Sequence, residues 1–167
     1  VARRVEELTG KTKGNVQGWV ADFTKSDSLE NICNRIQSLS HLHILINNAG
    51  ANHIKPIEEV KSNDLEQIMV LNLHAPTILS GAVAHLMKQQ RWGRILNIAS
   101  IWSVITKPGR AMYTASKFGL VGLTKATAID LGPNNILVNA LSPGFTLTDL
   151  THSTVPKKEQ NRISEQI

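Results

Sequence analysis

The chain has 167 residues, of which 41% are hydrophobic and 19% are charged, and this size and composition are typical of one soluble globular domain. Its net charge of +5 comes from lysines and arginines spread along the chain, with only 4% aromatic residues, so the sequence predicts no nucleic-acid partner. No apolar run approaches the length of a bilayer span and the start has no signal-peptide pattern, so we expect no membrane association.

Apolar segments alternate with helical patterns along the chain, which predicts β-α-β units around a parallel sheet and therefore an α/β fold. Segment 42–47 is almost continuously apolar, as are strands that are buried on both faces. Asn63, with Glu66 three residues later, resembles a capping box at the start of a long helix. In chain order, the predicted elements are strand 16–23, helix 27–39, strand 42–47, helix 63–89, strand 93–100, helix 112–131, strand 135–141 and helix 156–166.

The cysteine and histidine residues suggest no special chemistry. Cys33 is the only cysteine, and it lies among Leu29, Ile32 and Ile36 at helical spacing, which favours a buried core position over a reactive thiol. A chain without an internal disulfide suits a reducing compartment, so we expect a cytoplasmic protein. The six histidines show no metal-ligand spacing with carboxylates or cysteines, and we expect no metal site.

Polar and small residues gather where the predicted strands end. Asp22, the segment "NNAG" (47–50), Ser100 and the segment "SPG" (142–144) all lie at the carboxyl ends of strands. In open α/β sheets, ligands bind in the crevice outside those ends. The sequence therefore predicts that these residues contribute to one site.

Tyr113 and Lys117 in "YTASK" lie four residues apart, so they share one face of the predicted helix. Tyrosine is a poor base at neutral pH, and a nearby cation lowers the phenol pKa because it stabilises the phenolate. The pair is therefore a candidate device for proton transfer. Taken alone, it is equally typical of two polar residues on a helix surface.

Two further polar residues support a site. Ser100 ends a predicted strand, where its hydroxyl could reach the same crevice. Asn72 lies on the apolar face of its predicted helix, and a buried amide needs hydrogen-bond partners. Pro76 has no N–H to bond the Asn72 carbonyl, which predicts a kink and a carbonyl free to hold a water. Helix 112–131 also has a small-residue face, which favours close helix packing: Ala115, Gly119, Gly122 and Ala126.

These motifs together resemble the short-chain dehydrogenase/reductase family, in its 3-oxoacyl-carrier-protein reductase-like branch. The matching segments run through the whole chain in order: "NNAG" (47–50), "LNLHAP" (71–76), "NIAS" (97–100), "YTASK" (113–117), "LVNALSPG" (137–144) and "TLTDL" (146–150). The resemblance implies a Rossmann-type doubly wound parallel sheet. It also implies NAD or NADP as the cofactor and a carbonyl or alcohol as the substrate.

The resemblance assigns roles to individual residues. Tyr113 would exchange the substrate proton, Lys117 would lower its pKa and hold the nicotinamide ribose, and Ser100 would orient the substrate oxygen. Asn72 would place a relay water. Independently of the resemblance, Trp102 lies two residues after Ser100 and is a candidate for the wall of the substrate pocket, although a simple core role stays open. The cofactor would also contact a wider set: Asp22, Phe23, Asn48, Ala49, Gly50, Pro143, Gly144, Thr146 and Thr148.

Several family features are missing, so residues 1–167 are expected to form a single partial dinucleotide-binding and catalytic domain. The glycine-rich turn T-G-x-x-x-G-x-G does not occur, because "LTGKTKGN" (8–15) follows a predicted helix rather than a strand. The strand that selects NAD or NADP and the last strand of the sheet are also missing. We therefore expect a partial sheet that lacks the first βαβ unit and the last strand.

Two functions remain open at this level. The first is an NAD(P)-dependent oxidoreductase that transfers hydride to or from a ketone or secondary alcohol. The second is an inactive remnant that serves as an oligomerisation module. The family pairs the helices that correspond to 63–89 and 112–131 across a two-fold axis, which implies a homodimer or homotetramer.

Overall fold

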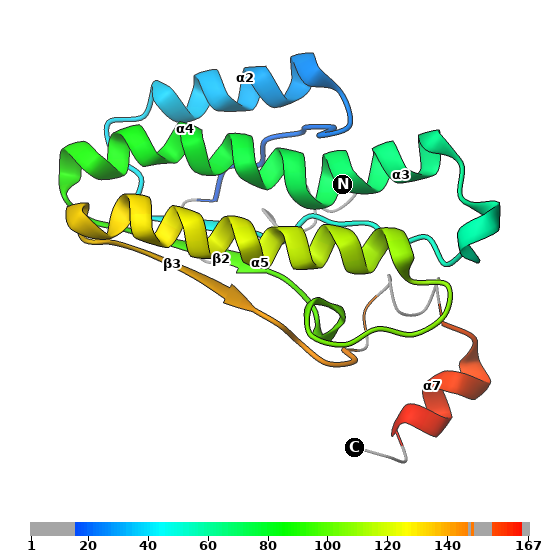
Figure 1. Ribbon diagram of the computed structural model, residues 1–167. Helices are drawn as coiled ribbons and strands as arrows, with labels where there is room; N and C mark the ends of the chain where they lie inside the picture. Colours follow the sequence, from blue (N-terminus) through cyan, green and yellow to red (C-terminus); the bar gives the residue numbers. More distant parts are fainter. Residues whose placement is uncertain (1–15, 147, 149–154, 165–167) are drawn as a thin grey trace.

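A computed structural model describes residues 16–146, 148 and 155–164 (Figure 1). Three parallel strands form a sheet in the order β1-β2-β3: β1 (Ile44–Asn47), β2 (Gly93–Ile98) and β3 (Ile136–Leu141). Ile95 of β2 stands opposite Leu45 of β1 and Val138 of β3. The parallel α/β fold predicted from the alternating pattern is confirmed, although β1 and β2 are two residues shorter than expected.

Helices cover one face of this sheet (Figure 1). Helix α4 (Ala75–Gln90) and helix α5 (Ala111–Leu131) lie against the strands, and α2 (Ser26–Gln37) packs outside α4. The core between these layers is closed by side chains that are less than 10% exposed: Leu29, Ile32, Cys33 and Ile36 from α2, Leu79, Val83 and Met87 from α4, and Ile95, Ile136 and Val138 from the sheet. Cys33 is a core residue, as its helical spacing predicts.

The helix predicted over 63–89 is a continuous helical segment from Ser62 to Gln90 with a defect near its middle. Helix α3 (Ser62–Met69) runs into a π-helical turn (Val70–His74), and α4 follows directly. The kink was predicted at Asn72 and Pro76, and the π-helical turn contains Asn72 and ends two residues before Pro76. The predicted cap is wrong, because the helix begins one residue earlier and the Lys61 backbone N–H donates to the Asp64 carboxylate at 3.2 Å.

By length and composition alone, the helical segment Ser62–Gln90 could cross a membrane, which the sequence prediction did not anticipate. Such a segment is also what the core helix of a globular domain looks like. Its residues Leu79, Val83 and Met87 are buried against the sheet and α2, so the apolar composition has an ordinary explanation in the core of the fold.

Two predictions about strands are wrong. The predicted strand 16–23 does not form: residues 16–22 have no regular secondary structure, residues 23 and 24 form a turn, and the described sheet contains only β1, β2 and β3. In β1, Ile44 is 58% exposed and Ile46 is 56% exposed, so this strand is not covered on both faces. Among the described residues, β1 is an edge strand with helices on one side only. Its apolar composition therefore does not mean that both of its faces are buried.

The carboxyl-terminal part of the chain follows the prediction more closely. Helix α5 starts one residue before the predicted 112–131, and a short 3-10 turn leads to Asn135, whose φ of 60° lies in the left-handed region that asparagine tolerates. The last helix, α7 (Lys157–Ser164), is shorter than the predicted 156–166. Residues 165–167 lie outside the described part of the chain.

Candidate active site

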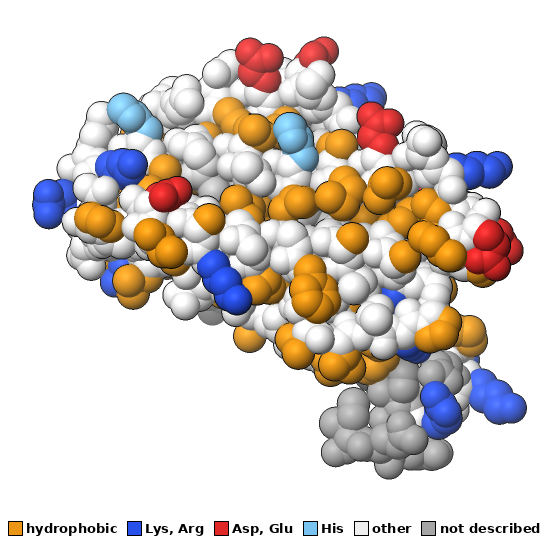
Figure 2. Space-filling model, viewed as in Figure 1, with side chains coloured by type: hydrophobic (Ala, Val, Ile, Leu, Met, Phe, Trp, Pro, Cys, Tyr) orange, Lys and Arg blue, Asp and Glu red, His pale blue; other side chains and the backbone are white. Residues whose placement is uncertain are grey.

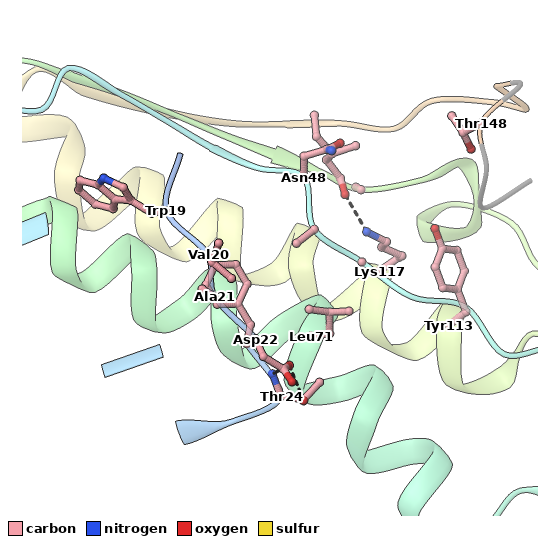
Figure 3. Close-up of a pocket in the computed structure, with 15 residues that line it drawn as sticks. Trp19, Val20, Ala21, Asp22, Thr24, Asn48, Leu71, Tyr113, Lys117 and Thr148 are labelled. Carbon is pink, nitrogen blue, oxygen red and sulfur yellow. Dashed lines mark hydrogen bonds between the residues drawn. The ribbon is translucent and has the colours of Figure 1, made fainter. Parts of the chain in front are cut away.

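A groove of about 810 Å³ opens at the carboxyl ends of β1 and β2 (Figure 3). Its walls come from the extended segment 19–24, from the loop after β1, from the end of β2 and from the amino-terminal half of α5. Tyr113 and Lys117 project from α5 towards this groove. The crevice expected at the strand ends is therefore present, and it has the size of an ordinary small-molecule pocket.

Tyr113 is buried, with 9% of its surface exposed, and its phenol is hydrogen-bonded to Ser100. Burial raises the pKa of Tyr113, while the hydrogen bond from Ser100 and the positive charge of Arg110 act in the opposite direction. The net shift is upward, whereas the sequence predicted a pKa lowered by the neighbouring lysine. Removal from water outweighs the nearby charges, and the phenol keeps its proton at neutral pH.

Lys117 lies one helical turn beyond Tyr113 and is only 5% exposed. Its Nζ donates to the Ile98 backbone oxygen at 2.7 Å and lies 5.6 Å from the centroid of the Tyr113 ring. Burial lowers the pKa of Lys117 to about 8. Since both side chains are buried, the interpretation of the pair as two polar residues on a helix surface is wrong.

Asn72 is completely buried in the π-helical turn, and its side chain is fully used. The Asn72 Oδ1 accepts from the Ala51 backbone N–H at 2.8 Å, and the Nδ2 donates to the Ala51 oxygen at 2.9 Å and to the Ser116 hydroxyl at 3.0 Å. These bonds fix the loop after β1 to the helices. A Cβ on Gly50 would lie 3.2 Å from the Asn72 Oδ1 and 3.7 Å from the Lys117 Nζ, so glycine leaves room at the groove.

Ser100 and Trp102 lie at the start of the loop between β2 and α5. The Ser100 hydroxyl accepts from the Trp102 backbone N–H at 3.3 Å, and Ser100 lies beside Tyr113 but is not among the residues that line the groove. The Trp102 ring meets the Phe145 ring edge-on at 6.0 Å between centroids. Trp102 therefore belongs to an aromatic cluster next to Ser100 and is not part of the main core.

The predicted cofactor residues divide into two groups. The groove is lined by Asp22, Phe23, Asn48, Ala49, Gly50, Tyr113, Lys117 and Thr148, as expected. Pro143, Gly144 and Thr146 are not among the residues that line it. The remaining residues of the segment 146–150 lie outside the described part of the chain.

The carboxylate of Asp22 points to its own turn. Its Oδ1 accepts from the Thr24 backbone N–H at 3.0 Å and from the Thr24 hydroxyl at 2.6 Å (Figure 3), and these bonds lower the Asp22 pKa. The turn gives the end of segment 19–24 a defined shape although the segment belongs to no strand. Asp22 is therefore held as an exposed anion at one end of the groove.

A row of buried side-chain hydrogen bonds, which was not predicted from the sequence, connects the strand ends to α5. Asn47 donates to the Asn97 side chain at 2.8 Å, and Asn97 donates to the Thr124 hydroxyl at 2.9 Å. Asn47 and Asn97 stand directly opposite each other in the β1–β2 register. The signal available in the sequence was the pair of asparagines just before the ends of two adjacent apolar strands.

Arg110 and Trp19 also lie at or near the groove, and the sequence pattern did not predict this. Arg110 is 3% exposed and lies with its guanidinium carbon 5.5 Å from the centroid of the Trp102 ring. Trp19 lines the groove, and Arg35 stacks on its ring at 4.1 Å. No periodicity marks these side chains, because their burial depends on neighbours far away in the sequence.

Known proteins are similar to this chain in sequence and in fold. The family model described as short chain dehydrogenase matches residues 1–159. The uncharacterized oxidoreductase YxjF of Bacillus subtilis (strain 168) is 39% identical over 142 residues, which are 84% of this chain and 55% of YxjF. The 3-oxoacyl-(acyl-carrier-protein) reductase FabG of Rickettsia prowazekii is 37% identical over 98% of this chain and 66% of the reductase, in agreement with the expected branch.

A solved structure agrees with these relatives. The 4-hydroxyisoleucine dehydrogenase mutant complexed with NADH and succinate has a TM-score of 0.87 and 34% identity, and the match covers 98% of this chain and 68% of the dehydrogenase. The chain spans only 55% to 66% of the length of the curated relatives compared with it above. The family model, the relatives and the parallel fold with its groove lead to one conclusion: this chain belongs to the short-chain dehydrogenase family.

Proposed function

We propose that the protein containing this chain is an NAD(P)-dependent oxidoreductase that interconverts a ketone and a secondary alcohol, with Tyr113 as the general acid and base. One observation carries the proposal: the Tyr113 phenol is buried at the groove, hydrogen-bonded to Ser100, with the Lys117 ammonium group one turn away. A buried phenol beside a hydroxyl and a cation is suited to moving one proton to or from a substrate oxygen. The similarity to named dehydrogenases and reductases supports the same reaction class.

The described residues of the groove are suited to a nicotinamide cofactor. Gly50 leaves space beside Lys117, whose ammonium group could donate to a ribose hydroxyl, and Asp22 lies at the end expected for the adenine. When bound, the cofactor supplies or accepts the hydride. The related 4-hydroxyisoleucine dehydrogenase was solved with NADH. We assign contacts at the cofactor also to Phe23, Asn48, Ala49 and Thr148 and, beyond the groove itself, to Pro143, Gly144 and Thr146.

Different residues of the chain have different roles at the substrate oxygen that gains or loses the proton. The raised pKa of Tyr113 keeps the phenol protonated, which favours donation to a carbonyl oxygen. Ser100 orients that oxygen through a hydrogen bond, and Trp102 lies beside it. The Asn72 side chain is occupied by Ala51 and Ser116. The Asn72 contribution to catalysis is therefore assigned to its backbone carbonyl, which would hold a water.

Substitution of Tyr113 by phenylalanine tests this function. We expect Tyr113→Phe to lower kcat by about 10²- to 10⁴-fold, because the proton donor is lost while the ring that fills the site remains. Calorimetry should find cofactor affinity almost unchanged. Lys125→Ala, at an exposed position of the same helix, is the control and should keep full activity. An active Tyr113→Phe variant, or a wild-type protein inactive with every ketone and alcohol tried, would favour the oligomerisation module instead.

The same proposal includes a homodimer or homotetramer formed through α3–α4 and α5. Apolar side chains gather on the face that these helices present (Figure 2). Ile78 is 40% exposed, Phe118 is 48% exposed and Ile129 is 78% exposed. On the small-residue side of α5, Gly119 already packs against Leu73, whereas Gly122 has open space beyond it. A second copy of the chain is the proposed partner for this face, and the single, buried Cys33 suits a cytoplasmic location.

A further inference from the structure

Arg110 is a buried cation without a hydrogen-bond partner for its Nε. The side chain is 3% exposed, and its Nε is one of the few buried polar atoms in the described part of the chain that no group bonds. No described carboxylate pairs with it. The Asp64 carboxylate is paired with Lys55, at 2.6 Å, and the Lys55 backbone N–H donates to the oxygen of Gly109, the residue before Arg110.

The surroundings of Arg110 place it beside the reacting groups. It is the residue immediately before α5 and precedes Tyr113 by three positions, so the two side chains start about 5–6 Å apart. Its charge acts on the Tyr113 phenol, and its guanidinium lies over the Trp102 ring. The amino terminus of α5 adds positive potential at the same point. A strongly positive region therefore lies next to the Tyr113–Ser100 hydrogen bond.

An arginine that serves only the fold is normally paired, because a buried charge without a partner is unfavourable. The contact with the Trp102 ring offsets only part of this cost. The planar guanidinium matches the two oxygens of a carboxylate in a bidentate arrangement. The missing partner is therefore best supplied by a ligand that enters beside Tyr113.

We infer that Arg110 binds the carboxylate of the substrate, and that the protein acts on a hydroxy acid or the corresponding keto acid whose carboxylate lies within a few bonds of the reacting carbon. This substrate class rests on the proposed oxidoreductase function and deepens it. Trp102 then forms the wall between carboxylate and solvent, and Tyr113 and Ser100 hold the oxygen that reacts. The similar 4-hydroxyisoleucine dehydrogenase was solved with succinate, a dicarboxylate, and another relative, 31% identical over 94% of this chain, is D-beta-hydroxybutyrate dehydrogenase.

Binding is the first test, because it requires no turnover. Calorimetry with the complete protein and NADH would measure the affinity for succinate and for neutral succinamide. We expect succinate to bind the wild type and to bind Arg110→Gln at least about tenfold more weakly, with partial recovery in Arg110→Lys. Arg91→Gln removes an exposed arginine far from the groove and should match the wild type. Equal affinity of Arg110→Gln and the wild type, or stronger binding of inorganic phosphate than of succinate, overturns the inference.

Measurements of turnover distinguish a failure of this inference from a failure of the proposed function. With 3-hydroxybutyrate and its methyl ester, the wild type should favour the acid, and Arg110→Gln should lose this preference mainly through a higher KM. Equal use of acid and ester by the wild type contradicts the role of Arg110 and leaves the oxidoreductase function intact. The melting temperature (Tm) tests the alternative that Arg110 only stabilises the fold. Loss of an unpaired buried charge should leave Tm unchanged or raise it, whereas a lower Tm with unchanged succinate binding would assign Arg110 to the fold alone.

Discussion

At the scale of single residues, the site is built from charges and polar groups that the fold keeps away from water. Lys117 is the clearest case, since the residue is 5% exposed and its ammonium group has one described hydrogen-bond partner, the Ile98 oxygen. Tyr113 is buried on the same helix, and Arg110 is buried immediately before the start of that helix. Such groups cost folding stability, and proteins retain them where a reaction or a ligand uses them.

The buried Lys117 should make stability depend on pH. Its pKa is about 8 in the folded protein and 10.5 in the unfolded chain, so the unfolded chain binds more protons between these values. The free energy of unfolding should therefore rise from pH 8 to pH 10.5, by roughly 3 kcal/mol in total from this group. Urea titrations across this range should show the rise in the wild type and a flatter profile in Lys117→Met.

Lys125→Met is the matched control for that measurement, because Lys125 is exposed on the same helix. Its pH profile should follow the wild type. A Lys117→Met profile with the wild-type slope would mean that Lys117 is not the group responsible. The expected sign follows from burial alone, since a depressed lysine pKa destabilises the folded state most at low pH.

Asn72 should matter for stability as well as for activity. Asn72→Ala leaves the Ala51 backbone N–H and oxygen and the Ser116 hydroxyl without their partner. We expect the free energy of unfolding to fall by about 3 kcal/mol. Chemical denaturation measures this, with Asn63→Ala on the exposed side of α3 as the control. A loss below about 1 kcal/mol would show that water replaces the amide and that the loop after β1 does not depend on it.

At the scale of elements, close contact between α4 and β2 sets the position of the sheet. A Cβ on Gly93, at the start of β2, would lie 2.7 Å from the Met87 Cγ and 2.9 Å from its Cβ. Gly93→Ala should therefore lower the free energy of unfolding by about 1–3 kcal/mol through overpacking. Gly144→Ala, which has open space, is the control. The double variant with Met87→Ala should recover part of the loss, and strict additivity of the two changes would argue against a direct clash.

At the scale of the whole molecule, the apolar face of α4 and α5 should determine assembly. Phe118→Lys puts a charge on this face, and we expect sedimentation to show a shift from dimer or tetramer towards monomer, because a desolvated charge opposes association. Val104→Lys changes a residue that is 71% exposed outside these helices and should leave the assembly unchanged. A wild-type protein that sediments as a monomer at micromolar concentration would remove the proposed interface.

The sequence by itself determined the type and order of most elements, and it singled out Asn72, Ser100, Tyr113 and Lys117 as the residues proposed for the site. These inferences depend on short-range patterns: apolar runs, helical spacing, a proline four residues after an asparagine, and motifs in a fixed order. Periodicity predicted α2, the continuous helical segment from α3 to α4 (Ser62–Gln90) and α5 within one or two residues at their ends. It also predicted the interruption near Asn72, because a missing N–H disturbs a helix wherever that helix packs.

Only the tertiary structure decided which groups are paired and which are buried. The failure of segment 16–23 as a strand and the exposure of Ile44 depend on neighbouring strands and helices, not on the local sequence. The upward pKa shift of Tyr113 and the unbonded Nε of Arg110 likewise arise from neighbours that the fold brings together. Solvent exposure and hydrogen-bond pairing are properties of contacts in space, and a local sequence pattern does not contain them.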